Sequence, residues 1–188
     1  MRTTVIPTSL DGVVIIEVDY FRDDRGFFIE TYRRSLFAEL GLPTDFVQDN
    51  HSRSRRGVLR GIHYQDMRAP MGKLVRCTRG AIWDVIVDLR FGAPTFGRWT
   101  AVQLDDETLR QVYIPVGFGH GFAVLSEVAD VEYRCTGYYA PEAEGTIAWN
   151  DPELAIPWPI AQPILSARDQ RGITLAEYRR QPAFSYHD

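Results

Sequence analysis

The chain has 188 residues, 45% of them hydrophobic and 24% charged, and it carries a net charge of −4 at pH 7. A chain of this length fits a single domain, residues 1–188, whose core needs neither disulfides nor a metal for stability. The negative charge argues against a general binder of nucleic acid or of membrane surfaces. Any anion site must therefore be a local cluster of Arg and Lys side chains.

Two features of the sequence predict a cytoplasmic protein. No apolar run approaches the roughly 20 residues that a membrane span requires, and the N-terminal residues lack the hydrophobic region of a signal peptide. The two cysteines, Cys77 and Cys135, are far apart and each lies in an apolar, strand-like run. We expect two free, buried thiols, with a reactive pair as the alternative.

Short apolar or alternating runs follow one another along the chain, with Gly, Pro and Asp turns between them. They predict strands at residues 13–18, 27–32, 46–48, 58–65, 73–78, 81–89, 99–104, 111–114, 122–125 and 128–136. Turn signals about every 8–12 residues are typical of a β-sandwich or barrel. The sequence therefore predicts an all-β barrel with small helical additions.

Helical signals are few. Ser35 is placed to cap a short helix over 36–40 that Gly41 ends, and a second helix is predicted from Thr174 to about Arg180. Residues 152–163 contain four prolines and one tryptophan. This composition predicts an extended, ordered loop packed on the barrel.

The motifs of several common chemistries are missing. Small β-barrels that hold a metal commonly use a His-x-His pair, but Tyr64 and Gln65 follow His63, so we expect no metal. No serine lies in a Gly-x-Ser-x-Gly turn, and neither cysteine has a histidine beside it in sequence. No Gly-x-Gly-x-x-Gly motif opens a helix, which argues against a dinucleotide cofactor.

Proton transfer remains as the available chemistry. His63 can act as a base near neutral pH, Lys73 can stabilise an enolate oxygen, and Tyr133 can return a proton. Each residue also has a structural interpretation, as a satisfied histidine, a solvated lysine at a strand end and a core tyrosine. Glycines around His63 and the nearby Arg60 favour a ligand site there.

Strand alternation constrains which side chains can share a pocket. Lys73 lies on the same face as residues 75 and 77, and Tyr133 on the same face as residues 131 and 135, consistent with one lumen. In a regular strand Arg60 and His63 would face opposite ways. Both can line one pocket only if the strand bulges or bends, and Gly61 is placed to allow it.

An ordered set of motifs resembles the dTDP-4-dehydrorhamnose 3,5-epimerase family. The resemblance runs from about residue 10 to residue 177, and the set is far more specific than any single motif. The matching runs are 46–52 (FVQDNHS), 57–65 (GVLRGIHYQ), 72–77 (GKLVRC), 84–90 (DVIVDLR), 93–97 (APTFG), 115–122 (PVGFGHGF), 138–144 (YYAPEAE), 149–152 (WNDP) and 165–169 (LSARD).

This resemblance implies a cupin-like jelly roll that works as a homodimer, with an active site in each barrel lumen. It implies that His63 is the base, oriented by Asp169, that Tyr133 is the opposing acid, and that Lys73 stabilises the enolate at the C4 oxygen. Phe27 or Phe28 would lie against the nucleotide base. The rest of the nucleotide and its diphosphate would be held by Arg25, Glu30, Gln48, Asn50, Arg60, His120, Tyr138, Glu144 and Arg168.

The implied reaction converts dTDP-4-dehydro-6-deoxy-D-glucose to dTDP-4-dehydro-L-rhamnose by proton transfer at C5 and C3, without a cofactor. One alternative is an epimerase that acts at a single carbon or on another nucleotide sugar. A second is a non-catalytic cupin that binds a nucleotide sugar, which the retained set of His63, Lys73, Tyr133 and Asp169 disfavours. A third is a metal-dependent cupin, which the missing His-x-His pair disfavours.

Two positions depart from the family pattern. The common Ser-x-Lys-Asp form is here Ser166-Ala167-Arg168-Asp169, so a planar guanidinium replaces a point ammonium. Asp49 adds a carboxylate next to residues expected to bind an anionic substrate. We expect its side chain to face away from the lumen.

Overall fold

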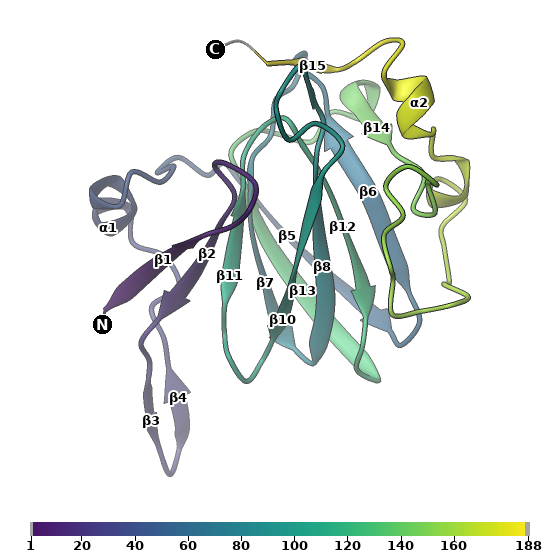
Figure 1. Ribbon diagram of the computed structural model, residues 1–188. Helices are drawn as coiled ribbons and strands as arrows, with labels where there is room; N and C mark the ends of the chain where they lie inside the picture. The colour runs from purple at the N-terminus through teal and green to yellow at the C-terminus, as the bar shows by residue number, and fades with distance from the viewer. Residues whose placement is uncertain (1, 187–188) are drawn as a thin grey trace.

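The computed structural model describes residues 2–186, and most of the chain forms two antiparallel sheets that face each other (Figure 1). The larger sheet has the spatial order β1 (Thr3–Pro7), β2 (Val14–Val18), β11 (Gln111–Ile114), β7 (Lys73–Arg79), β13 (Val128–Cys135) and β5 (Gln48–Arg55). The smaller sheet has the order β10 (Trp99–Asp105), β8 (Ala81–Asp88), β12 (Phe118–Val124), β6 (Leu59–Gln65) and β14 (Glu144–Thr146).

Successive strands from β10 to β14 alternate between the two sheets, as do β5 to β8. This crossing is the connectivity of a jelly roll, and it confirms the predicted all-β, cupin-like class. The two sheets keep separate hydrogen-bond ladders, so the predicted barrel is a pair of facing sheets. Two short pairs complete the strands, β3 (Phe21–Asp23) with β4 (Gly26–Phe28) and β9 (Arg90–Phe91) with β15 (Phe184–Ser185).

The main core lies between the two sheets. Val75 and Cys77 of β7 and Val131 of β13 are buried there against Ile82 and Ile86 of β8. These side chains occupy alternate positions of their strands, because successive residues of a strand point to opposite faces. The lumen shared by β7 and β13 is therefore confirmed.

The outer face of the five-stranded sheet is also covered. Val85 and Val87 of β8 pack there in a second apolar cluster that includes Leu154 and Ile156. In the same segment, Trp158 Nε1 donates a hydrogen bond to the carbonyl oxygen of Trp149 at 2.7 Å. The proline-rich loop over 152–163 is thus ordered and packed, as predicted.

The helices are short and lie at the periphery (Figure 1). Helix α1 (Arg34–Glu39) buries Phe37, but Arg33 and not Ser35 stands at its N-cap, without a side-chain hydrogen bond. Helix α2 (Leu175–Tyr178) begins after Thr174 as predicted and ends earlier than expected. Single 3-10 turns lie at η1 (Pro141–Ala143) and η2 (Asp169–Arg171).

Three predicted strand limits were wrong. The strand expected over 27–32 ends at Phe28, and Tyr32 instead packs its ring on those of Phe37 and Phe46 at 4.8 and 5.4 Å. The strand expected over 46–48 continues to Arg55, because its polar residues pair along the whole of β13. Strand β12 already starts at Phe118, since its glycines allow close packing between β8 and β6.

Both cysteines are free and buried, as expected from the sequence. No helix within residues 2–186 is long and apolar enough to cross a membrane.

Candidate active site

A cavity of about 300 Å³ opens at one end of the sandwich, where β5 and β7 begin and where β6 and β13 end. Its walls therefore come from both sheets, and most of its lining side chains are polar. The lining residues are Gln48, Asn50, His63, Tyr64, Gln65, Met71, Lys73, Tyr133, Tyr139, Glu144 and Arg168. This set contains three of the four predicted catalytic residues, and the fourth, Asp169, contacts one of them.

His63 and Asp169 form a close pair although 106 positions separate them in sequence. Nε2 of His63 lies 2.5 Å from Oδ1 of Asp169, and Ser166 Oγ donates to the other carboxylate oxygen at 2.7 Å. Burial alone would raise the pKa of Asp169, but the hydrogen bonds from His63 and Ser166 outweigh it and hold this pKa below 3.8. The carboxylate is therefore charged at neutral pH and can hold the imidazole in one orientation.

The imidazole of His63 is suited to accept a proton. Burial lowers the pKa of His63 below its ordinary value of 6.5, while Asp169 acts in the opposite direction. The ring is therefore neutral at pH 7. Because the charged Asp169 accepts the proton on Nε2, the lone pair lies on Nδ1, which is the basic nitrogen.

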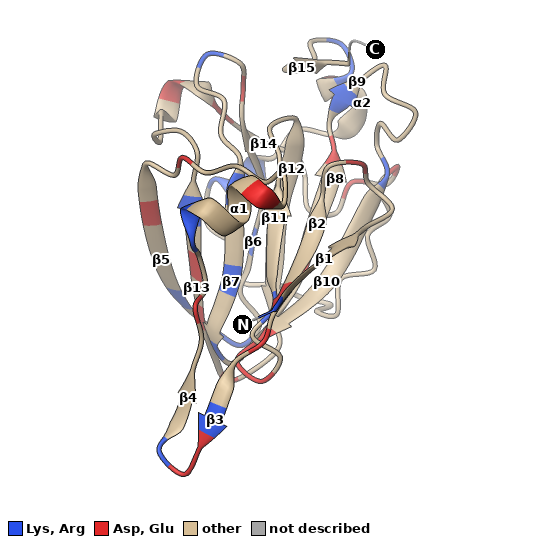
Figure 2. Cartoon of the chain, turned by 90° about the vertical axis from the view of Figure 1, so that its left-hand side faces the viewer, with Lys and Arg blue, Asp and Glu red and all other residues tan. Residues whose placement is uncertain are grey.

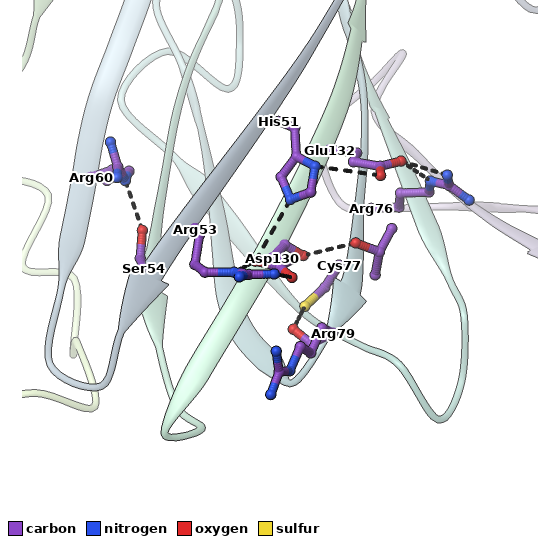
Figure 3. Close-up of polar contacts among 10 residues, drawn as sticks. His51, Arg53, Ser54, Arg60, Arg76, Cys77, Arg79, Asp130 and Glu132 are labelled. Carbon is purple, nitrogen blue, oxygen red and sulfur yellow. Dashed lines mark hydrogen bonds and ion pairs between the residues drawn. The ribbon is translucent and has the colours of Figure 1, made fainter.

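Strand β6 bends at Gly61, two residues before His63. Gly61 has a φ of +118°, its peptide bond to Ile62 is cis, and the pairing with β12 shifts register at this point. A Cβ atom at Gly61 would lie 2.5 Å from the Cα of Gly121, so only glycine fits. Arg60 donates from Nε to Ser54 Oγ of β5 at 3.0 Å (Figure 3). Arg60 and His63 thus both face the lumen, as the sequence predicted for a bent strand.

Lys73 and Tyr133 lie on the sheet opposite His63. Lys73 is the first residue of β7 and Tyr133 lies on the adjacent strand β13, with Nζ 5.8 Å from the centroid of the tyrosine ring. Burial lowers the pKa of Lys73 and raises the pKa of Tyr133. Tyr133 therefore keeps its proton at neutral pH and faces His63 from the other wall of the cavity.

Arg168 and Glu144 close one side of the cavity. Arg168 Nη1 donates to Glu144 Oε2, and its Nη2 lies 3.0 Å from Nε2 and 3.3 Å from Nδ1 of His63. Tyr139 donates from its hydroxyl to the same Glu144 oxygen at 3.0 Å. Arg168 thus contacts His63 directly, whereas Glu144 and Tyr139 are linked to it only through Arg168.

Two residues of β5 that the family resemblance implies for substrate binding lie at the cavity. Gln48 Nε2 donates to Asn50 Oδ1 at 3.1 Å, and both side chains line the cavity. Asp49, between them, is 70% exposed and pairs with Arg134 at 3.6 Å on the other face of the sheet. The expectation that Asp49 faces out is met.

The outer face of this sheet carries a network of charges. Arg53 donates to both oxygens of Asp130, at 2.6 and 2.7 Å, and Arg76 pairs with Glu132 at 2.5 Å (Figure 3). His51 lies 3.6 Å from Asp130 and 3.8 Å from Glu132. These residues alternate with the lumen-facing ones, so the charged face and the cavity are separated by the thickness of one sheet.

His120 is buried beside the cavity. Its Nε2 lies 2.7 Å from Oδ2 of Asp84, which is fully buried, and its Cα pairs with that of His63 across β12 and β6. The other oxygen of Asp84 has no hydrogen-bond partner among the described residues. Sequence reasoning did not find Asp84, because an aspartate inside an apolar run gives no sign of the strand it faces.

Four predicted substrate-binding residues lie away from the cavity of their own chain. Arg25, Phe27 and Phe28 belong to the β3–β4 hairpin, and Glu30 follows it and pairs with Arg33 at 3.2 Å. The hairpin follows the end of β2, whereas the first residue of β2 pairs toward the Lys73 end of the sheet. It therefore projects from the opposite end of the sandwich (Figures 1 and 2).

One predicted tyrosine is replaced by its neighbour. Tyr138 is 69% exposed and its carbonyl accepts a hydrogen bond from Gln65 at 3.1 Å, but Tyr139 lines the cavity. Both tyrosines lie in a loop without periodicity, so the sequence could not decide which ring turns inward. Other lining residues that the sequence did not indicate are Tyr64, Gln65 and Met71.

A cupin-like jelly roll whose cavity sets a neutral, oriented histidine opposite a tyrosine and a lysine is the class of protein suited to acid–base chemistry. The sequence profile of the dTDP-4-dehydrorhamnose 3,5-epimerases matches residues 7–177. The chain therefore belongs to the dTDP-4-dehydrorhamnose 3,5-epimerase family.

Individual relatives agree with this assignment. The chain is 53% identical over 171 residues to a dTDP-4-dehydrorhamnose 3,5-epimerase of Pseudomonas aeruginosa, covering 90% of this chain and 94% of that protein. It is 45% identical over 174 residues to a dTDP-4-dehydrorhamnose 3-epimerase of Streptomyces niveus, covering 92% and 84%. A crystal structure of a dTDP-6-deoxy-D-glucose-3,5-epimerase from Legionella pneumophila, in complex with dTDP-4-keto-L-rhamnose, is 46% identical, covers both chains fully and has a TM-score of 0.95.

Proposed function

We propose that this protein epimerises dTDP-4-dehydro-6-deoxy-D-glucose at C5 and C3, giving dTDP-4-dehydro-L-rhamnose. The observation that carries the proposal is the His63–Asp169 pair on one wall of the cavity, opposite Tyr133 and Lys73 on the other. Inversion of a carbon requires a proton to leave from one face and to return on the other. A base and an acid on facing sheets supply this geometry.

Each catalytic side chain has a role that its environment supports. His63, neutral at pH 7, removes the proton next to the C4 ketone through Nδ1, and Asp169 stabilises the imidazolium that forms. Lys73 donates to the C4 oxygen as it becomes an enolate. Tyr133 keeps its proton at neutral pH and returns it from the opposite wall. Together these steps move only protons. That no cofactor takes part is expected from the sequence and stays a prediction.

The same cavity offers groups for the nucleotide and its diphosphate. Arg168 and the amides of Gln48 and Asn50 line the cavity and provide donors for phosphate oxygens. Arg60, which is bonded to Ser54 outside the cavity lining, can add a further donor. Tyr139 is half exposed at the cavity, so its ring offers a face on which a base can stack. The net charge of the chain is negative, and these local cations supply the anion site that composition required.

The remaining predicted binding residues support a homodimer. Phe21, Phe27 and Phe28 are exposed by 66%, 50% and 66% on a hairpin that forms a sheet of its own. A projecting segment with such apolar surface is typical of a protein–protein contact. We place this hairpin against the partner of a two-fold dimer, where Arg25, Phe27 and Phe28 reach the partner's cavity. A cytoplasmic location is part of the same proposal and agrees with two free cysteines.

The relatives differ in the number of carbons that their names say they invert. The Streptomyces niveus protein is described as a 3-epimerase, and the Pseudomonas aeruginosa protein as a 3,5-epimerase. One base and one enolate stabiliser can serve both neighbours of C4 if the sugar ring re-seats between the two steps. The flexible arm of Lys73 allows this.

The test is incubation with the 4-keto-6-deoxy nucleotide sugar in deuterium oxide, followed by NMR at C3 and C5. Label at both carbons with the L-sugar as product is the expected result. Label and inversion at one carbon only, even with excess enzyme, would replace the proposal with a single-carbon epimerase. No label at either carbon would reject the proposed activity and favour a protein that binds a nucleotide sugar without converting it. Metal analysis of the active protein checks the expected absence of a metal.

A further inference from the structure

Arg168 holds an unusual place for a cation in this cavity. Its Nη2 lies within 3.3 Å of both ring nitrogens of His63, and its Nη1 is fixed by Glu144. The arginine side chain is 44% exposed, while that of Glu144 is 15% exposed. One end of the guanidinium is therefore anchored at the cavity wall, while part of the side chain remains accessible to a ligand.

This contact opposes the use of His63 as a base. Nε2 gives its proton to Asp169, so Nδ1 carries the one lone pair of the ring. A guanidinium can only donate hydrogen bonds, and Nη2 lies 3.0 Å from Nε2 and 3.3 Å from Nδ1. Because Nε2 carries a proton, Nδ1 is the ring nitrogen that can accept from Nη2. A proton cannot be taken up by a nitrogen whose lone pair is engaged by a cation. The charge of Arg168 also contributes to the low pKa of His63, after burial.

A diphosphate group is a stronger partner for Arg168 than an imidazole. Arginine binds phosphate oxygens through paired, charge-assisted hydrogen bonds, which are roughly twice as strong as neutral ones. Gln48 and Asn50, which are proposed to bind the diphosphate, line the same cavity as Arg168.

We propose that Arg168 exchanges between His63 and the diphosphate of the nucleotide sugar, so that binding of the diphosphate frees the catalytic base. Arg168 is thus a positioning residue that links substrate binding to the availability of His63. The identity of the anion rests on the proposed function, whereas the exchange rests on the contacts of Arg168. A lysine at this position would have a single point of contact, so the exchange is a property of the arginine that this chain carries.

The experiment follows the pKa of His63 by NMR in protein labelled with ¹⁵N in its histidine rings. The signal is assigned by its loss in His63→Gln. The titration is run on the free protein, with dTDP, with inorganic pyrophosphate, and with thymidine, which lacks the diphosphate. Other charged and titratable groups around His63 must stay unchanged among the variants. They are Asp169, Glu144, Lys73, Tyr133 and the His120–Asp84 pair.

The expected result is that dTDP and pyrophosphate raise the pKa of His63 by about one unit, a tenfold rise in proton affinity, and that thymidine leaves it unchanged. In Arg168→Gln the pKa is expected to be raised already in the free protein. The diphosphate then adds only its direct electrostatic effect, which is smaller than the shift in the wild type. Arg168→Lys restores the charge near His63 and should recover part of the low pKa.

Arg60→Gln is the matched control, because it removes an arginine of the same strand as His63 whose side chain is bonded to Ser54 and not to His63. Its free protein should show the wild-type pKa of His63. The proposal is overturned if neither diphosphate probe moves this pKa in the wild type, or if Arg168→Gln responds as the wild type does. Turnover is not part of the readout, so a protein that passes this test but does not epimerise the keto sugar would refute only the proposed function.

Discussion

The cavity and the β3–β4 hairpin are built in opposite ways. The side chains of the cavity are held by the two sheets and by each other, as in the bonds of His63 to Asp169 and of Arg60 to Ser54. The hairpin pairs only with itself, and its three phenylalanines are half exposed or more. Residues of both regions belong to the predicted substrate site. Within a single chain, however, only the cavity residues lie near one another, and the hairpin lies at the other end of the sandwich.

This difference separates two kinds of functional residue. A group that acts on a proton must be positioned to within a fraction of an ångström, so it is placed on buried strands that cannot move independently. A group that covers part of a ligand can come from another subunit, because association completes its environment. Changes in the cavity should therefore abolish chemistry in the chain that carries them, and changes in the hairpin should be rescued by a partner.

The largest effect is expected from the base. His63→Ala should lower deuterium exchange at both carbons by about 10²–10⁴-fold, since no other group of the cavity can replace an oriented imidazole. Affinity for dTDP, measured by calorimetry, should stay close to that of the wild type. In a mixed dimer with the wild type, the cavity that carries His63→Ala should stay inactive, because the partner supplies only a hairpin and not a base. Exchange at the wild-type rate would show that another residue is the base.

Tyr133→Phe tests the opposite wall of the cavity. Removal of one hydroxyl changes little volume, so the thermal transition should move only slightly. Exchange at C5 should continue, because His63 and Lys73 are intact, while inverted product should fall by about 10²-fold or more. NMR of the label and of the product sugar measures the two separately. Loss of both together, with dTDP binding preserved, would mean that Tyr133 is needed before reprotonation.

The hairpin is tested with the double variant Phe27→Ser and Phe28→Ser. Because both side chains are exposed, unfolding free energy should change by less than about 1 kcal/mol, while activity and dimer content fall. Mixing this variant with His63→Ala should restore activity, since a mixed dimer joins an intact base with an intact hairpin from the other chain. Light scattering follows the dimer.

Met67→Ser is the control for that experiment, because it removes a 61% exposed apolar side chain elsewhere on the surface. It should leave both dimer content and activity as in the wild type. A monomeric wild type of 21.5 kDa, or a mixture that stays inactive, would place the hairpin outside the partner's cavity.

The pH dependence of catalysis sharpens the account of the cavity. His63 must be neutral to act as a base, and its pKa is lowered by burial, so the acid limb of kcat/KM should lie below pH 6.5. Asp169 raises the pKa of His63 against this effect. Asp169→Asn should therefore move the limb to still lower pH and reduce kcat, because the base becomes weaker. A limb that moves upward would contradict the assigned pair.

The smallest effect concerns stability. In the folded state the pKa of His63 lies below 6.5, so the unfolded chain binds a proton more readily. This contribution to stability is complete above pH 6.5 and is lost as the pH falls toward the folded-state pKa, by about 1.4 kcal/mol for each unit of difference. Urea unfolding on both sides of pH 6.5 should show a weaker loss in His63→Gln than in the wild type. Equal losses would mean that His63 titrates as a free histidine.

The sequence by itself determined the all-β class, most of the strands and the faces of those strands. Alternation in β7 and β13 was enough to place Lys73 and Tyr133 in one lumen, and Gly61 was enough to predict the bend that puts Arg60 and His63 on the same face. These properties are local, because a strand shows its buried face within a few residues. Ordered motifs added the family, and with it the prediction that Asp169 orients His63.

Only the tertiary structure decided which distant residues meet. It joined His63 to Asp169, set Arg168 against the base and Asp84 against His120, and turned Tyr139 rather than Tyr138 toward the cavity. It also carried the hairpin to the far end of the sandwich. Contacts of this kind depend on the register of two sheets and on the path of loops without periodicity. Both are fixed by the packing of the whole chain, which no short stretch of sequence contains.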